Sequence, residues 1–299
     1  MDRDGIGVAM RRIGGGLPTA ALRVKYGGRD RRVEYAGLLR AARSAGFELM
    51  SLADFNARST LDSAPPARWL ALRHDVDICD PVGNEAFRAI EMEAGARSTF
   101  YFRWSTVGAH EDLIRRLLRD EFEVGYHFEE AATVAKRHAL TSRPAVEARR
   151  EEIADLTRRN CATFRERWNP DLASISSHGD WANRRLGFSN NEFISPELLT
   201  DCGLRFEAYG DEILGRVTAY VSDVATPPQE WTDGYGLIES LRDGHASICM
   251  LTHERRWHVN RRASVTADVD RLRDELAYRW RRRRARLSRR DAAPEADTA

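Results

Sequence analysis

Short apolar segments alternate with amphipathic helical segments along most of this chain, and this alternation limits the possible folds more than any other feature. The expected strands are 69–72, 98–104, 122–126, 173–177, 204–209, 217–221 and 246–251. Helical spacing predicts helices from about 34, at 82–94, at 111–121, within 144–165, and at 196–202, 237–241 and 266–284. Repeated strand-helix units with short connections predict a parallel sheet, and their number suits a complete or distorted (β/α) barrel better than an open sheet.

The length of the chain is compatible with one large domain. It has 299 residues, of which 42% are hydrophobic and 31% are charged, as in ordinary globular proteins. Since α/β barrels commonly use roughly 200 to 250 residues as one domain, we expect a single barrel domain at 31–278. Glycine-rich 1–30 is expected to be a flexible lead-in, and 279–299 an arginine-rich helix end with an acidic tail.

Two further features bear on the cellular compartment. The first thirty residues lack an apolar signal segment, and no later stretch approaches eighteen uninterrupted apolar residues. The four cysteines form no Cys-x-x-Cys pair, so we expect neither a disulfide framework nor a cysteine-built zinc site. These features predict a cytoplasmic protein, and they leave its oligomeric state open.

Charge is unevenly distributed along the chain. Residues 279–290 contain eight arginines, whereas the part up to residue 278 is mildly acidic. We therefore expect no nucleic-acid-binding face on the barrel itself. The arginine run continues a helix that carries four apolar residues on one side, namely Val269, Leu272, Leu276 and Trp280. It is either a contact for an anionic partner, such as lipid, nucleic acid or an acidic protein, or a solvated helix end whose arginines suit the helix dipole.

Polar residues follow nearly every expected strand at its carboxyl end. In chain order they are Asp75 and Asp77, Arg103 and Trp104, His127 and Glu129, His178 and Asp180, Asp223, and His253 and Glu254. Singly, each has a structural explanation as a helix cap or a hydrogen-bonded core residue. Because strand ends converge on one rim of a barrel, the joint pattern predicts an active site there.

The residue types at this rim suit metal-assisted hydrolysis. Asp and His side chains are ligands that Zn²⁺ accepts. Asp75 and Asp77 are two residues apart on an extended segment, so they project to the same side and can serve one site in two roles. One binds metal, and the other takes a proton.

Four ordered motifs carry a resemblance to a known family. They are LRHDVD at 72–77, STFYF at 98–102, EVGYHFE at 123–129 and LTHERRW at 251–257. In this order they resemble a bacterial branch of the polysaccharide deacetylase (NodB-like) family, over roughly residues 35 to 260. The resemblance implies a distorted (β/α) barrel of the glycoside hydrolase/deacetylase type.

The resemblance also implies roles for individual residues. Asp75 resembles the family's catalytic base, Asp77 its metal-binding aspartate, His127 the first histidine of its metal pair, and His253 its general acid. The implied cofactor is a divalent metal, with Zn²⁺ as the expected ion. The implied reaction is hydrolysis of an acetamide to acetate and a free amine.

The chain departs from the family pattern at the second metal histidine. Ala131 stands at the position four residues after His127, and His138 lies too far along the chain to replace it. Three residues are candidates for the missing metal ligand: Glu129, Glu130 and His178. Otherwise the site binds metal weakly or does not bind it at all. We favour His178, because it follows another strand and Gly179 allows close approach of the backbone. The family's Arg-x-Pro segment has no clear counterpart either.

Further residues near the strand ends are candidates for substrate binding. They are Arg103, Trp104, Glu129, Asp180, Trp181 and Trp257. Tryptophan rings stack on the apolar faces of sugars, although core packing explains them equally well.

The sequence thus predicts a hydrolase that removes an N-acetyl or other N-acyl group from an amino sugar or a glycan precursor. A cytoplasmic location favours a nucleotide-linked, lipid-linked or small substrate over finished cell wall. Two alternatives stay open: a barrel without hydrolytic activity that binds glycans or assists assembly, and an amidohydrolase acting on a non-sugar amide.

Overall fold

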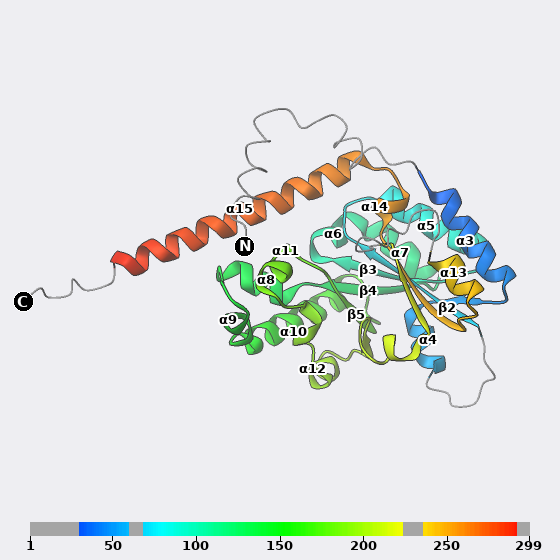
Figure 1. Cartoon of the computed structure of the whole chain (residues 1–299), viewed down its shortest axis with the longest axis horizontal. Coiled ribbons are helices and arrows are strands. Elements are labelled where there is room, and N and C mark those ends of the chain that lie inside the picture. The colour runs from blue at the N-terminus through cyan, green and yellow to red at the C-terminus, as the bar shows by residue number, and fades with distance from the viewer. Residues whose placement is uncertain (1–29, 60–67, 224–235, 292–299) are drawn as a thin grey trace, which may run out of the picture.

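The computed structural model describes residues 30–59, 68–223 and 236–291, and it contains an eight-stranded parallel sheet curled into a half-barrel (Figure 1). The strands are β1 (Glu48–Met50), β2 (Trp69–Val76), β3 (Thr99–Arg103), β4 (Glu123–Phe128), β5 (Ser174–Ser177), β6 (Phe206–Glu207), β7 (Ala219–Ser222) and β8 (Ser247–Thr252). Their order is β6-β5-β4-β3-β2-β8-β7, with β1 pairing the first residues of β2. The predicted parallel α/β architecture is therefore confirmed.

Strand β2 lies at the centre of the sheet. It pairs with β8 through residues 69–74 and with β3 through residues 73–76, so its whole length has neighbours. All of its residues after Trp69 are buried, as expected for a strand covered on both faces. Because every pairing is parallel, the carboxyl ends of the strands lie at one edge of the sheet.

Helices surround the sheet. Those before β5 are α3 (Arg32–Ser44), α4 (Leu52–Ser59), α5 (Pro81–Glu93), α6 (Trp104–Val107), α7 (Glu111–Arg119), α8 (Glu130–Arg137), α9 (Arg143–Glu147) and α10 (Arg150–Arg167). Those after it are α11 (Trp181–Leu186), α12 (Pro196–Asp201), α13 (Leu237–Arg242), α14 (Glu254–Trp257) and α15 (Arg261–Asp291). Short 3₁₀ helices occupy Gly108–His110, Asn190–Phe193 and Leu214–Arg216.

The largest apolar cluster lies between the sheet and the helices that cover it. Leu39 of α3, Phe87 of α5, Leu117 of α7 and Phe164 of α10 all belong to it. Within α3 and α7 the buried residues recur at helical spacing, which made these helices predictable from the sequence. They are Tyr35, Leu38, Leu39 and Ala42 in α3, and Leu113, Ile114 and Leu117 in α7.

Strand β4 contains a glycine that allows close packing between neighbouring strands. A Cβ at Gly125 would lie 2.3 Å from Cε1 of Tyr101 on β3. With no side chain there, the Tyr101 ring passes over β4 and its hydroxyl hydrogen-bonds Oγ of Ser174 on β5 at 2.8 Å. The absent Cβ is what permits this contact.

Helix α15 crosses the molecule beside the carboxyl edge of the sheet, and its second half runs past α8 and α9 (Figure 1). Asp80, which caps α5, accepts hydrogen bonds from Asn260 at 2.9 Å and contacts Nδ1 of His258 at 2.6 Å, and Asn260 in turn caps the start of α15. Farther along, Tyr278 is buried against Trp181 and Ala182 of α11. No helix in the described ranges is both long enough and apolar enough to cross a membrane. The expected lead-in at 1–30 and the tail beyond residue 291 lie almost wholly outside the described residues.

Candidate active site

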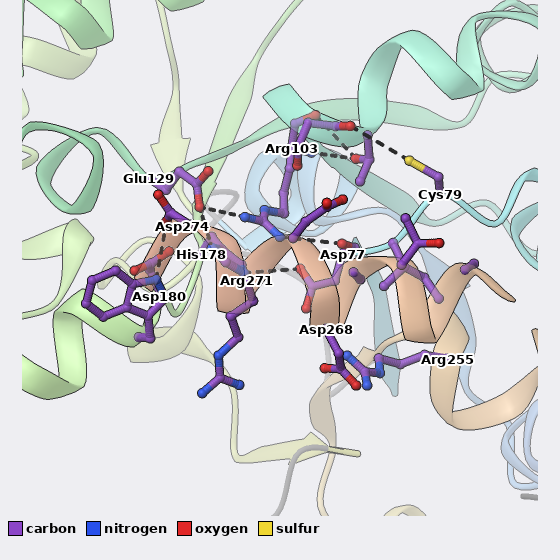
Figure 2. Close-up of a pocket in the computed structure, with 18 of the residues that line it drawn as sticks. Asp77, Cys79, Arg103, Glu129, His178, Asp180, Arg255, Asp268, Arg271 and Asp274 are labelled. Atoms are coloured by element: carbon purple, nitrogen blue, oxygen red, sulfur yellow. Dashed lines mark hydrogen bonds and ion pairs between the residues drawn. The ribbon is translucent and has the colours of Figure 1, made fainter. Parts of the chain in front are cut away.

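A cavity of about 790 Å³ lies between the carboxyl edge of the sheet and α15 (Figure 2). Asp77, Arg103, Glu129, His178 and Asp180 line it from the strand ends. Helix α15 supplies the facing wall, with Arg271 and Asp274 among its lining residues. The cavity thus occupies the rim at which the sequence predicts a site.

Asp77 follows β2 and is the point on which two histidines converge. Nε2 of His127 lies 3.5 Å from its Oδ1, and Nε2 of His178 lies 3.6 Å from the same oxygen. This Oδ1 is buried and has no hydrogen-bond partner among the described residues. Burial alone would raise the pKa of Asp77, but the nearby imidazoles of His178, His127 and His253 outweigh it and hold the pKa well below its ordinary value.

The other nitrogen of each histidine is held by a hydrogen-bond acceptor. Nδ1 of His127 lies 2.9 Å from the carbonyl oxygen of Ser176, and Nδ1 of His178 lies 2.8 Å from Oε2 of Glu129. Each Nδ1 therefore donates, and in the neutral ring each Nε2 directs a lone pair toward Asp77. Two lone pairs and a carboxylate oxygen facing one another repel unless a cation or a proton lies between them.

Two features of this arrangement suit a divalent cation at Asp77. Ligating histidines commonly donate their second ring N–H to a carboxylate or a backbone carbonyl, as His178 and His127 do here. Atoms that share a tetrahedral metal about 2.1 Å away lie roughly 3.4 Å apart. The two distances to Oδ1 of Asp77 are close to that separation.

A second group of ligand-type residues has cationic partners already. Donor atoms of Glu129, His178 and Asp180 lie within 4.8 Å of one another. Glu129, however, pairs with Arg103 at 2.8 Å, and Asp180 pairs with Lys136 at 2.8 Å. These carboxylates are thus neutralised by side chains. Asp77, His127 and His178 form the other candidate set, with two donor separations of 3.5 and 3.6 Å. Among the described residues, the Glu129 group is the one whose donor atoms all lie within 4.8 Å of one another.

Asp75, the predicted base, forms a buried bidentate ion pair with Arg73. The guanidinium donates Nε to Oδ1 at 2.8 Å and Nη2 to Oδ2 at 2.7 Å, and neither side chain is more than 2% exposed. Burial would raise the pKa of Asp75, but Arg73 and then His127 lower it below its ordinary value. Oδ2 also lies 3.4 Å from Nε2 of His127, so Asp75 borders the same centre as Asp77.

His253, the predicted general acid, is paired with Asp223. Its Nδ1 lies 2.7 Å from Oδ1 of Asp223, while Oδ2 accepts from the His253 backbone N–H at 2.7 Å and from Nε1 of Trp257 at 2.9 Å. Burial would lower the pKa of His253, but the carboxylates of Asp223, Asp77 and Asp75 raise it to about 9. The free Nε2 lies 3.9 Å from Oδ2 of Asp77. His253 is therefore cationic at neutral pH.

Glu254 is a further unusual group at this rim. Its Oε1 accepts from the Ile78 backbone N–H at 3.0 Å, whereas its buried Oε2 has no hydrogen-bond partner among the described residues. Burial, and then the charge of Asp77, raise its pKa to about 8. At neutral pH this side chain is therefore mostly a neutral acid.

The structure brings four of the six predicted substrate-binding residues to the cavity. Arg103 and Glu129 line it as an ion pair, and Asp180 lines it while capping α11. Trp181 lines it and donates Nε1 to Asp274 at 3.3 Å.

The other two tryptophans lie elsewhere. Trp104 packs edge-on against Tyr126 and Trp168, and Trp257 is 1% exposed in the apolar core. Neither is among the described residues that line the cavity.

The position at which the family places its second metal histidine is apolar here. Ala131 is buried on α8 in a cluster with Val134 and Phe193. His138 lies near the surface and contacts Glu152 at 2.8 Å. His178 instead joins His127 at Asp77, with its Nε2 3.6 Å from Oδ1. Of the predicted catalytic and metal-binding residues, Asp77 and His178 line the cavity, whereas Asp75, His127 and His253 lie behind its lining.

Sequence reasoning missed the partners of the predicted base and acid. Arg73 lies two residues before Asp75 within the recognised motif, and this spacing on a strand places both side chains on one face. Asp223 was visible as a strand-end residue, but its contact with His253 depends on the pairing of β7 with β8.

Fold and site together define a parallel α/β half-barrel protein with an aspartate-histidine cluster at the carboxyl edge of its sheet. No protein-family model and no curated protein matches the sequence.

Proposed function

We propose that this chain is a metal-dependent hydrolase of the deacetylase type, with a distorted (β/α) barrel, that removes an N-acetyl or other N-acyl group from an amino sugar or a glycan precursor. The observation that carries the proposal is the convergence of two histidine Nε2 atoms on one unpartnered oxygen of Asp77. Asp75 and His253 border that centre as an anionic and a cationic group. A proton acceptor and a proton donor on either side of one centre suit hydrolysis of an amide.

When held by Asp77, His127 and His178, a divalent cation such as Zn²⁺ supplies Lewis acidity toward the amide oxygen and toward water. Arg73 keeps Asp75 ionised, so that Asp75 accepts a proton from the attacking water. His253 donates its Nε2 proton to the departing amine, and Asp223 stabilises the imidazolium until that proton leaves. The products are a carboxylic acid and a free amine.

The size of the cavity supports a small substrate. About 790 Å³ lies within the range of roughly 300 to 1,000 Å³ that is typical of small-molecule sites. Paired charges from Arg103 with Glu129 and Lys136 with Asp180 line much of its wall, which favours a polar substrate.

One observation favours a second candidate, an amidohydrolase acting on a non-sugar amide. Among the described lining residues Trp181 is the only Trp, Tyr or Phe, and its ring packs against Tyr278 of α15. The cavity therefore offers little ring surface for stacking on a sugar.

Metal content and acetate release test the proposal together. We expect the purified full chain to hold one divalent metal and to release acetate from at least one of a panel of neutral, nucleotide-linked and lipid-linked N-acetyl amino sugars. Asp77→Asn and His178→Ala lose the metal and the activity, because each removes a ligand. Asp75→Asn keeps the metal but slows acetate release by about 100-fold or more. The control His138→Ala, a histidine outside the cavity, changes neither.

The alternatives predict other results. Bound metal without acetate from any sugar, but with release from simple N-acyl amides, supports the second candidate. A chain that binds no metal at all contradicts the proposal and supports a barrel that only binds glycans or assists assembly.

A further inference from the structure

Helix α15 exposes an apolar stripe on the face that points away from the protein body, with Arg283 as the one charged residue inside its arc. The stripe consists of Val265, Val269, Leu272, Leu276, Trp280 and Leu287, each between 40% and 58% exposed. At 100° per residue these positions fall within an arc of about 80° and extend over roughly 33 Å of helix. Six of the eleven exposed large hydrophobic residues among the described ones therefore lie in this one stripe.

Contacts on the opposite face of α15 fix the stripe in this outward position. Tyr278 is buried against α11 and donates its hydroxyl proton to the carbonyl oxygen of Leu140. Asp274 pairs with Lys136 at 3.0 Å, and Nε of Arg281 donates to the Lys136 carbonyl at 3.2 Å. Turning the stripe inward would break these contacts, so its exposure follows from how the helix is docked.

The second half of the same helix carries a large positive charge. From Leu276 to Arg290 the sequence has eight arginines and no Asp or Glu. Arg279 pairs with Glu275 of the preceding turn, while Arg283 and Arg284 are exposed. Like charges four residues apart, such as Arg279 and Arg283, destabilise an isolated helix. An anionic surface would offset this repulsion and stabilise the second half of α15.

The stripe and the charge together select among possible partners. A second copy of the chain would cover the stripe but bring eight further arginines. A nucleic acid would neutralise the arginines but leave the stripe in water. An anionic bilayer does both, because Val, Leu and Trp enter the boundary between headgroups and acyl chains while arginines reach the lipid phosphates.

We propose that the outward face of α15 docks in the plane of an anionic bilayer surface. The helix lies on the membrane and does not cross it, in keeping with its many charges. The inference is independent of the proposed hydrolase activity.

Co-sedimentation of the full chain with lipid vesicles tests the docking. We expect the protein to sediment with vesicles of phosphatidylglycerol and phosphatidylcholine in equal parts, and much less with phosphatidylcholine alone. Leu276→Gln combined with Trp280→Gln lowers the partition coefficient about tenfold, since two apolar anchors are lost while a good helix former replaces each. Arg283→Gln combined with Arg284→Gln lowers it by a similar factor.

Val82→Gln is the matched control, because Val82 is an exposed apolar residue on α5, away from the stripe. It leaves partitioning unchanged, and circular dichroism shows that all variants stay folded. Three outcomes would overturn the proposal. The first is no preference for anionic vesicles. The second is binding to duplex DNA that depends on the arginines but not on the stripe. The third is a dimer in solution that is lost in the Leu276 and Trp280 double variant.

Discussion

The three histidines of the candidate site each have a hydrogen-bond acceptor at Nδ1, and these acceptors come from different segments of the chain. A backbone carbonyl engages His127, while His178 and His253 each contact a carboxylate. Asp223 raises the pKa of His253 together with Asp77 and Asp75, so His253 is cationic where a metal ligand must be neutral. The sequence identified all three histidines as strand-end residues. The family resemblance implied a metal ligand for His127 and a general acid for His253, and His178 was the favoured further ligand. The Nδ1 partners could not be predicted, because they come from other segments of the chain.

Replacing Asp223 by Asn tests the role of His253 as proton donor. A general acid works only while protonated, so activity falls as pH rises through its pKa, which is about 9 in the native protein. Without the negative charge of Asp223 the pKa of His253 drops, and the alkaline limb of the kcat/KM profile moves to lower pH by about one unit or more. Acetate release measured across pH checks this. An alkaline limb that stays in place would mean that another group donates the proton.

Strand β2 supplies Arg73 and Asp75, and Asp77 follows directly after its end, so one short segment contributes an ion pair and a candidate ligand at alternate positions. The sequence predicted the first half of this strand, 69–72, because those residues are apolar; the structure extends it through polar residues to Val76. The sequence did not predict α8, whose short apolar stretch Ala131–Ala135 lies between charged residues and gives no clear period. The contact of Arg73 with Ser176 also went unseen, since Ser176 lies on β5, which is not adjacent to β2 in the sheet.

Removal of the guanidinium from β2 leaves a buried carboxylate without its partner. Arg73→Met is expected to lower the free energy of unfolding by about 3 to 5 kcal/mol, because Asp75 stays buried and loses both hydrogen bonds. Urea unfolding followed by circular dichroism measures the change. The matched control is Arg58→Met, which breaks an ion pair with Glu48 that is nearly half exposed and costs about 0 to 1 kcal/mol. Equal effects in the two variants would contradict the argument.

For the molecule as a whole, α15 is the element whose placement the sequence indicated least. Helical spacing predicted the helix and put its apolar residues on one side, yet that side faces solvent and the polar side forms a wall of the cavity. Tyr278 and Asp274 determine this orientation through contacts with α11 and Lys136. Such contacts depend on segments more than 90 residues apart in the sequence, which periodicity does not capture.

A metal that joins three strand ends should stabilise the whole fold. Asp77 follows β2, His127 belongs to β4 and His178 follows β5, so these ligands come together only in the native state. Zn²⁺ at 100 times its Kd adds about 2.7 kcal/mol and raises Tm by roughly 5 °C or more. A chelator reverses the rise, and His178→Ala abolishes it while His138→Ala retains it. Differential scanning fluorimetry provides the measurement, and a Tm indifferent to metal in the native chain would argue against the assigned ligands.

The contact between Gly125 and Tyr101 limits how this chain can diverge. A side chain at residue 125 would collide with the Tyr101 ring, whose hydroxyl reaches Ser174 on the next strand. The two positions are therefore expected to change together or not at all during evolution. Gly125 lies two residues before His127, so a paired glycine and tyrosine at these positions would mark distant relatives of this chain.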